Sequence, residues 1–389
     1  MRVAHCINCS EYKYIESEGM CRSCSSKGNL NIGQDENNAY NYINPDSLHY
    51  GLNIIGDYNT GKSTMAVHII KQLQDMEYGV FYFDDKNEIT NLHLNKFNVV
   101  DFSDGFNIMK IARDVGDKNY AEEVKNTSQI VKNLIYRNTN DIISFDNKKI
   151  LDAVIKSILY LNKEYNIQKV YECLVDLTQR KKLFKNSHYQ LISTKHNLSK
   201  VKEKGLGSDD AIISSLYDLI YNKNLMDKIS KIGSSINITN IVNNKETVIF
   251  SQNKLLQSSS QRIINTSVSE KIYNEIKLQN NSSPDEGKYI FCYDDIQKIA
   301  DIREKMLNVG YKNNIGVINI ISGLYGKNKR QIKYADNIIS FRITKTSMAA
   351  KIHKILGVNK FEIVNMEDYR YISNIQDTKY RGEIKTEPF

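Results

Sequence analysis

The sequence predicts an α/β protein whose mostly parallel sheet is flanked by helices and interrupted by an all-α insertion. Three observations lead to this prediction. Apolar strand patterns alternate with helical patterns on both sides of a helical block, a glycine-rich loop joins one strand to a helix, and four cysteines precede the first strand of that series. We therefore expect a small N-terminal module, an α/β core and a helical insertion.

The composition is typical of a globular chain. Of 389 residues, 53 are Lys or Arg and 45 are Asp or Glu, which gives a net charge of +8. Hydrophobic residues make up 41% and there are three prolines, a balance that excludes disordered and collagen-like chains. No stretch of 18 apolar residues occurs and the N-terminus is polar, so we expect no membrane span, no signal peptide and a cytoplasmic location.

The N-terminal module is defined by two Cys-x-x-Cys pairs separated by eleven residues. Four thiolates at this spacing suit a closed tetrahedral Zn²⁺ site. The intervening segment, Ser10 to Met20, is long enough for one small hairpin, so the pattern predicts a zinc ribbon. A redox dithiol or a coincidental spacing of cysteines is the alternative interpretation. The predicted zinc ligands are Cys6, Cys9, Cys21 and Cys24.

A phosphate-binding loop follows the apolar run Tyr50 to Ile55. The segment Gly56 to Thr64 reads Gly-x-x-x-x-Gly-Lys-Ser-Thr and leads into a helical pattern, which is the P-loop arrangement. Backbone N–H groups and the helix N-terminus bind phosphates, Lys62 contacts the β- and γ-phosphates, and the Ser63 hydroxyl ligates Mg²⁺. The sequence therefore predicts ATP with Mg²⁺, bound by Gly56, Asn59, Thr60, Gly61, Lys62, Ser63 and Thr64.

A P-loop needs an acidic metal partner at the end of another buried strand. The hydrophobic segment beginning at Tyr289 ends in Asp294 and Asp295. We expect Asp294 to hold Mg²⁺ and Asp295 to polarise the attacking water. Glu is usual at the second position, and Asp is one methylene shorter. The chain is thus predicted to have a P-loop NTPase fold.

Further periodic segments define the predicted domains. Strand patterns occur at Gly79–Asp84, Phe97–Asp101, Thr247–Ser251, Lys288–Tyr293, Ile315–Ile321 and Asn337–Phe341, and helical patterns at Tyr120–Tyr136, Lys149–Leu161 and Ala211–Tyr221. We divide the chain into a zinc ribbon (1–30), a polar linker (31–47), the first part of the core (48–110), a helical insertion (111–235), the second part of the core (236–345) and a C-terminal extension (346–389).

Two basic clusters are candidate functional surfaces. Eight basic residues between Arg180 and Lys204 stand against Glu203 alone, a local charge of +7. This run is either a solvated helix face or a track for a phosphate backbone. The second cluster lies in the loop around Arg330, after the strand that follows the acidic one. This cluster is either a basic surface loop or the source of a residue, Arg330, that acts in trans on the γ-phosphate of a neighbouring subunit.

The order of these pieces resembles the FtsK/HerA superfamily of DNA-pumping ATPases, particularly its conjugation-type and viral genome-packaging branches. Asp84-Asp-Lys-Asn-Glu88 resembles the family's Asp-Pro-Lys-Gly-Glu-like stretch, and Phe106-Asn107 its Phe-Asn element before the helical insertion. The resemblance implies a RecA/FtsK-like fold and adds Glu88 to the catalytic candidates. Ser322 and Tyr311 stand where the family carries a γ-phosphate-sensing Gln and commonly an Arg.

The leading hypothesis is an ATPase that moves double-stranded DNA as a ring, expected to be a hexamer, in packaging or transfer, with other transfer or packaging proteins as partners. It would work in the cytoplasm or with a virus or mobile element inside its host. Two alternatives stay open. One is a P-loop helicase or replication-initiation ATPase on single strands, for which Phe184 and Tyr189 are candidate stacking aromatics. The other is a nucleotide-gated scaffold with little hydrolysis.

Overall fold

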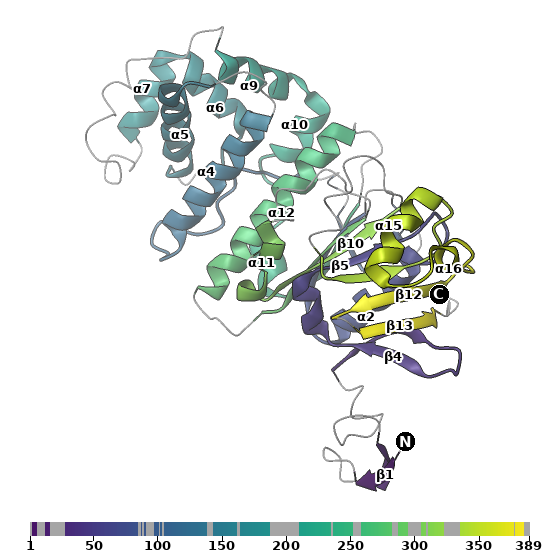
Figure 1. Cartoon of the computed structure of the whole chain (residues 1–389). Coiled ribbons are helices and arrows are strands. Elements are labelled where there is room, and N and C mark those ends of the chain that lie inside the picture. Colours follow the sequence, from purple (N-terminus) through teal and green to yellow (C-terminus); the bar gives the residue numbers. More distant parts are fainter. Residues whose placement is uncertain are drawn as a thin grey trace. The chain divides into compact units, whose positions relative to one another are not determined.

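The structure is a computed structural model that describes most of the chain as two compact units (Figure 1). Unit 1 comprises Met1–Val99, Lys245–Ile249 and Gly287–Phe389, and unit 2 comprises Val100–Asn244 and Phe250–Glu286. The described residues are 28–84, 87, 89–90, 97–100, 102, 105–137, 143–161, 164–186, 210–234, 236–251, 258–281, 287–294, 305–308, 310–322, 335–376 and 378–384, with the backbone of 2–5 and 12–15.

In the described part of the chain, unit 1 is built on an eleven-stranded sheet in the order β4-β3-β13-β12-β11-β5-β10-β9-β6-β8-β7. Its central strands β11, β5, β10, β9 and β6 pair in parallel. Their bounds are β5 Leu52–Ile55, β6 Gly79–Asp84, β9 Tyr289–Asp294, β10 Ile315–Ile321 and β11 Asn337–Ser340, and on one side lie β8 Thr247–Ser251 and β7 Asn98–Val100. The predicted α/β fold with a mostly parallel sheet is confirmed.

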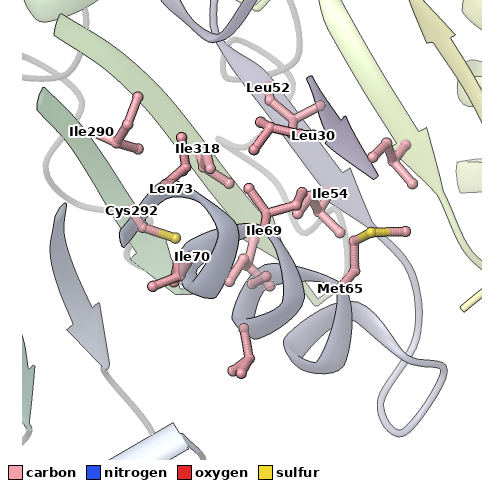
Figure 2. Packing of buried hydrophobic residues seen from close by; sticks show 14 of the residues in the cluster. Leu30, Leu52, Ile54, Met65, Ile69, Ile70, Leu73, Ile290, Cys292 and Ile318 are labelled. Carbon is pink, nitrogen blue, oxygen red and sulfur yellow. The ribbon is translucent and has the colours of Figure 1, made fainter. Parts of the chain in front are cut away.

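Continuous apolar sequence explains the centre of the sheet. Every residue of β5, β6, β9, β10 and β11 is buried, as expected for parallel strands covered on both faces. Helix α2 (Lys62–Asp75) covers one face with side chains spaced three to four residues apart, among them Met65, Ile69 and Leu73 (Figure 2). This packing fixes the helix N-terminus at the carboxyl ends of the strands.

The segment predicted as a linker instead contributes strands to the sheet. β3 (Leu30–Gln34) and β4 (Tyr40–Ile43) form an antiparallel hairpin, and a 3₁₀ helix, η1 (Pro45–Tyr50), follows. Leu30 and Ile32 are fully buried, and Asp35 accepts the backbone N–H groups that close the turn. The linker prediction was wrong because the alternation of apolar and polar residues in β3 and β4 is short and lies between turn-forming residues.

The C-terminal residues extend the same sheet. Helices α15 (Thr346–Leu356) and α16 (Lys360–Val364) precede the antiparallel strands β12 (Arg370–Ile375) and β13 (Thr378–Glu383). β12 pairs with β11, and β13 meets β3 through Glu383 and Gln34. The short helix η3 (Tyr311–Asn313) precedes β10. Residues from both ends of the chain therefore lie in one sheet with the P-loop strand.

Unit 2 is helical in its described residues. Its helices are α4 Tyr120–Arg137, α5 Phe145–Leu159, α6 Ile167–Val175, α7 Leu177–Asn186, α9 Ala211–Tyr221, α10 Lys223–Ile229, α11 Ile238–Asn243 and α12 Ser258–Asn280. In sequence, unit 2 is inserted before β8 and again between β8 and β9. An ion-pair network ties α12 to α4, since Arg113 binds Glu275 through two hydrogen bonds of 2.6 and 2.8 Å and also contacts Glu123.

Two short strands are described near the N-terminus. β1 (Arg2–His5) pairs antiparallel with β2 (Tyr12–Ile15), with Arg2 opposite Ile15 and His5 opposite Tyr12. Because β2 pairs with β1, the first Cys-x-x-Cys lies in the sequence between paired strands, whereas we expected the hairpin inside the following segment. The four cysteines themselves lie outside the described residues, so the zinc ribbon stays a prediction.

Candidate functional site

The P-loop connects the end of β5 to the start of α2. Gly61 adopts the left-handed conformation with a φ of 108°, and a Cβ there would lie 3.0 Å from ring carbons of both Phe341 and Tyr369. Asn59 also has a positive φ of 59°. Glycine is therefore required at position 61 both by its backbone angle and by close packing, which explains the second glycine of the motif.

Lys62 is held at this loop. Lys62 is only 4% exposed, and its ammonium group donates a 2.5 Å hydrogen bond to the carbonyl oxygen of Asp57. The same carbonyl accepts the Thr60 hydroxyl at 2.9 Å. Tyr58 and Asn59, at the tip of the loop, are exposed. The loop therefore presents a buried positive charge beside the N-terminus of α2, which together favour an anion.

The outer side of the P-loop is fixed by the segment that follows β11. Asp57 donates its N–H to the carbonyl of Arg342 at 2.9 Å, and its carboxylate accepts the backbone N–H and hydroxyl of Thr344 at 2.7 and 2.6 Å. Tyr369 donates its N–H to the carbonyl of Thr60 at 2.9 Å. These contacts join residues 285 to 309 positions apart and hold one side of the loop in place.

Two buried carboxylates end neighbouring strands of the same sheet. Asp294 at the end of β9 and Asp84 at the end of β6 are each 1% exposed and stand opposite one another in the parallel register. Asp84 accepts the backbone N–H and the hydroxyl of Thr90, both at 2.8 Å. Sequence analysis assigned Asp294 but not Asp84, although Gly79–Asp84 carries the same signal, an apolar strand that ends in a carboxylate.

Burial and the nearby carboxylates shift the pKa values of the side chains around this pair. The hydroxyl of Tyr82 donates to Asp294 at 3.3 Å. Burial first, and then the Asp294 carboxylate, raise the pKa of Tyr82 well above its usual value. Burial, Asp294 and Asp84 likewise raise the pKa of the Cys292 thiol, which keeps that thiol protonated and unreactive.

Oxygen ligands at this position fit Mg²⁺. Mg²⁺ takes one or two carboxylates together with hydroxyl, water and phosphate oxygens. Asp294 lies at the level of Ile320 on β10, and Ile320 pairs with Ile54 two residues before the P-loop, so the carboxylate and Ser63 share one edge of the sheet. In the described ranges no three His, Cys, Asp or Glu side chains converge on a metal position, so a metal here would draw on nucleotide oxygens as well.

β10 lies between the P-loop strand and the acidic strand and ends beside both. Gly56 donates its N–H to the carbonyl of Ile321 at 3.2 Å. Ser322, the next residue, is 7% exposed. Ser322 therefore follows β10 directly beside the first glycine of the P-loop.

The basic run of unit 2 is only partly on the surface. Arg180 is 1% exposed and donates to the carbonyls of Cys173 and Leu174 at the end of α6, at 3.2 and 2.8 Å. It therefore stabilises a helix end, and burial lowers its pKa. Phe184 is also 1% exposed, which excludes it as a stacking platform. The exposed basic residues of α7 are Lys181, Lys182 and Lys185.

Comparison with solved structures shows what this architecture is similar to. The bacterial conjugative coupling protein TrwBdeltaN70 in its unbound form matches with a TM-score of 0.61 and 11% identity, over 90% of this chain and 87% of that chain. TrwB with ADP and Mg²⁺ matches with a TM-score of 0.59 and 10% identity, over 90% and 88%. VirB4 of Thermoanaerobacter pseudethanolicus matches with 0.55 and 10%, over 92% and 97%. The chain has the fold of these FtsK/HerA-type P-loop ATPases.

The predicted resemblance to FtsK/HerA-type proteins is thus confirmed at the level of fold. No protein-family model matches the sequence, and no curated protein matches it either. In this fold the P-loop and Asp294 lie at one edge of the sheet, and their roles in binding and catalysis stay predictions. Glu88, Asp295 and Arg330 lie outside the described residues and stay predictions. No helix in the described part of the chain is long and apolar enough to cross a membrane.

Proposed function

We propose that this chain is an ATPase that couples hydrolysis to the movement of double-stranded DNA during packaging or transfer. The observation that supports this most directly is the joint placement of the Lys62 loop and the buried carboxylates Asp84 and Asp294 at one edge of a parallel sheet. This arrangement suits a triphosphate with Mg²⁺, because Mg²⁺ takes carboxylate and phosphate oxygens as ligands. DNA as the moved substrate is supported by the net charge of +8 and the fold.

The proposed motor works as a ring, expected to be a hexamer, with Arg330 of one subunit acting on the γ-phosphate bound by the next. The exposed lysines Lys181, Lys182 and Lys185 of α7 would grip DNA phosphates. Ser322 would take the place of the sensing glutamine. We further propose that Asp295 orients the attacking water, that Glu88 assists, and that the N-terminal cysteines bind Zn²⁺ in a module that contacts DNA or a transfer or packaging protein.

The deciding experiment measures ATP turnover of the parent chain and of Lys62→Ala with no DNA, with duplex DNA and with single strands. Stimulation by duplex supports the motor, stimulation by single strands alone supports the helicase alternative, and no appreciable turnover in any condition supports the scaffold. Lys62→Ala removes the charge on the β/γ-phosphates and should abolish turnover. Lys354→Ala, which removes an exposed lysine of α15, is the matched control and should behave as the parent.

The trans-acting role of Arg330 has its own test. Arg330→Ala should lower turnover by about a thousandfold or more and leave nucleotide affinity near the parent value, because such a residue acts on transition-state charge. Doping parent rings with increasing fractions of this variant should reduce turnover per parent subunit, since neighbouring sites lose their arginine. Parent-like turnover by Arg330→Ala alone would refute the assignment.

A further inference from the structure

The strand order fixes the direction in which a bound triphosphate runs. The carboxylates that would meet the Mg²⁺ and the γ-phosphate end β9 and β6, on one side of the P-loop strand β5. The other neighbour of β5 is β11. Because the P-loop cradles the phosphates between these two sides, the nucleoside end points away from β9 and towards the residues that follow β11. Those residues are therefore where base and ribose would lie.

Three side chains gather beside the outer face of the P-loop at this position, and we call Arg342, Asp368 and Tyr369 the nucleoside surface. Arg342 Nη2 donates to Asp368 Oδ1 at 2.8 Å, and the two side chains are 34% and 45% exposed, respectively. The ring of Tyr369 lies next to Gly61, since a Cβ on that glycine would meet the ring at 3.0 Å. The Arg342 and Asp368 side chains are therefore accessible to a ligand, and the Tyr369 ring adjoins the loop.

Tyr369 adopts a left-handed backbone conformation. Its φ is 65°, a conformation that non-glycine residues adopt less often than glycine. The hydrogen bond from its N–H to the carbonyl of Thr60, at 2.9 Å, holds it in this conformation. This geometry places the aromatic ring of Tyr369 against Gly61 of the nucleotide loop.

The chemistry of the three groups matches a nucleoside. A guanidinium plane and a phenol ring both stack on aromatic bases, and a carboxylate accepts ribose hydroxyls. Within the described residues the buried Nε of Arg342 has no hydrogen-bond partner. We propose that Arg342 and Tyr369 contact the base of the bound nucleoside triphosphate and that Asp368 accepts a ribose hydroxyl. This inference rests on the proposed function only in assigning the P-loop to a nucleotide.

The test compares a ligand that has a nucleoside with one that lacks it. Calorimetric titration with a slowly hydrolysed ATP analogue and with inorganic tripolyphosphate, both with Mg²⁺, is carried out on the parent, Arg342→Ala and Tyr369→Leu. Each variant should bind the analogue about tenfold more weakly, the scale of one lost stacking contact, and tripolyphosphate as the parent does. Tyr369→Phe keeps the ring and should restore affinity, and Arg370→Ala removes a neighbouring arginine that pairs with Glu367 instead and should change neither affinity.

Each other outcome has a definite meaning. Equal weakening of both ligands in the variants would show that these residues only support the P-loop, and unchanged binding of both would show that the nucleoside lies elsewhere. Either result overturns the nucleoside surface and leaves the proposed function standing. By contrast, parent protein that binds neither ligand, or Lys62→Ala that binds both as the parent does, overturns the nucleotide assignment on which the proposal rests.

Discussion

Asp84 and Asp294 stand directly opposite one another on the parallel strands β6 and β9, and both are buried. Neighbouring strands are about 4.8 Å apart, so two carboxylates share a small volume of low dielectric. Thr90 donates two hydrogen bonds to Asp84, and Tyr82 donates one to Asp294. Two buried carboxylates at the ends of adjacent strands suit a bound divalent cation, because Mg²⁺ takes one or two carboxylates as ligands.

The first prediction separates the roles of the two carboxylates. Asp294→Asn should lower ATP turnover by about a hundredfold or more because the metal loses a charged ligand. Asp84→Asn should instead raise the Mg²⁺ concentration for half-maximal turnover by about tenfold, as expected for a group that supports the ligand. Magnesium titrations of steady-state ATPase activity measure both effects. Tyr82→Phe keeps both charges and serves as the control, and a parent-like magnesium profile for Asp84→Asn would contradict this assignment.

The second prediction concerns the exposed lysines of α7. Neutralising Lys181, Lys182 and Lys185 together should weaken DNA binding for all sequences and reduce the slope of log affinity against log salt by roughly one unit per lost phosphate contact. Basal turnover should survive. Fluorescence anisotropy at several salt concentrations gives the slope. Arg180 is buried and is left unchanged. An unaltered slope would mean that these lysines are only a solvated face.

The third prediction addresses the stability of unit 2. The side chains of Arg113 and Glu275 are only 12% and 6% exposed and form a two-point ion pair, which raises the pKa of Arg113. Glu275→Gln should lower the free energy of unfolding by about 2 kcal/mol or more, because it leaves a buried guanidinium short of a charge partner. Glu122→Gln breaks an exposed pair with Lys125 and should change stability by about 0.5 kcal/mol at most. Urea titrations of both variants check this, and equal effects would contradict it.

The fourth prediction follows from Lys271. Its ammonium donates to the carbonyl of Lys110, and burial lowers its pKa to about 8 despite the opposing effects of Glu123 and Glu275. Between pH 8 and the pKa of the unfolded state, the unfolded chain binds more protons at this site, so stability rises with pH. The parent should gain about 2 kcal/mol over Lys271→Met between pH 8 and pH 10. Parallel pH dependences of unfolding for the two proteins would refute the lowered pKa.

The fifth prediction tests the N-terminal module. Protein purified without chelator should contain about one zinc per chain, held by Cys6, Cys9, Cys21 and Cys24, since two Cys-x-x-Cys pairs can close a four-sulfur shell. Replacing Cys6 and Cys9 by serine should release the metal. Elemental analysis decides the matter, and less than about half an equivalent in the parent would count against the ribbon.

Much of the fold was predictable because its signals are local. The ranges predicted for β6, β8, β10 and α9 agree residue for residue with the structure. Continuous apolar runs can be read from consecutive positions, and so can the period of an amphipathic helix. The P-loop and the carboxylate of Asp294 were predictable for the same reason, since each lies at the boundary of an element with a strong pattern.

What the tertiary structure decided depends on residues far apart in the sequence. Nothing near Asp84 indicates that it faces Asp294, 210 positions later, and nothing near Asp57 indicates that Thr344 binds its carboxylate. The hairpin β3–β4 joins the sheet because β3 pairs with β13, a strand more than 300 residues later in the chain. Burial likewise removed Arg180 from the basic surface. The periodicity of a sequence shows which of its residues face an apolar core. Strand pairing, strand register and the meeting of charged side chains from different strands are set only when distant segments pack together.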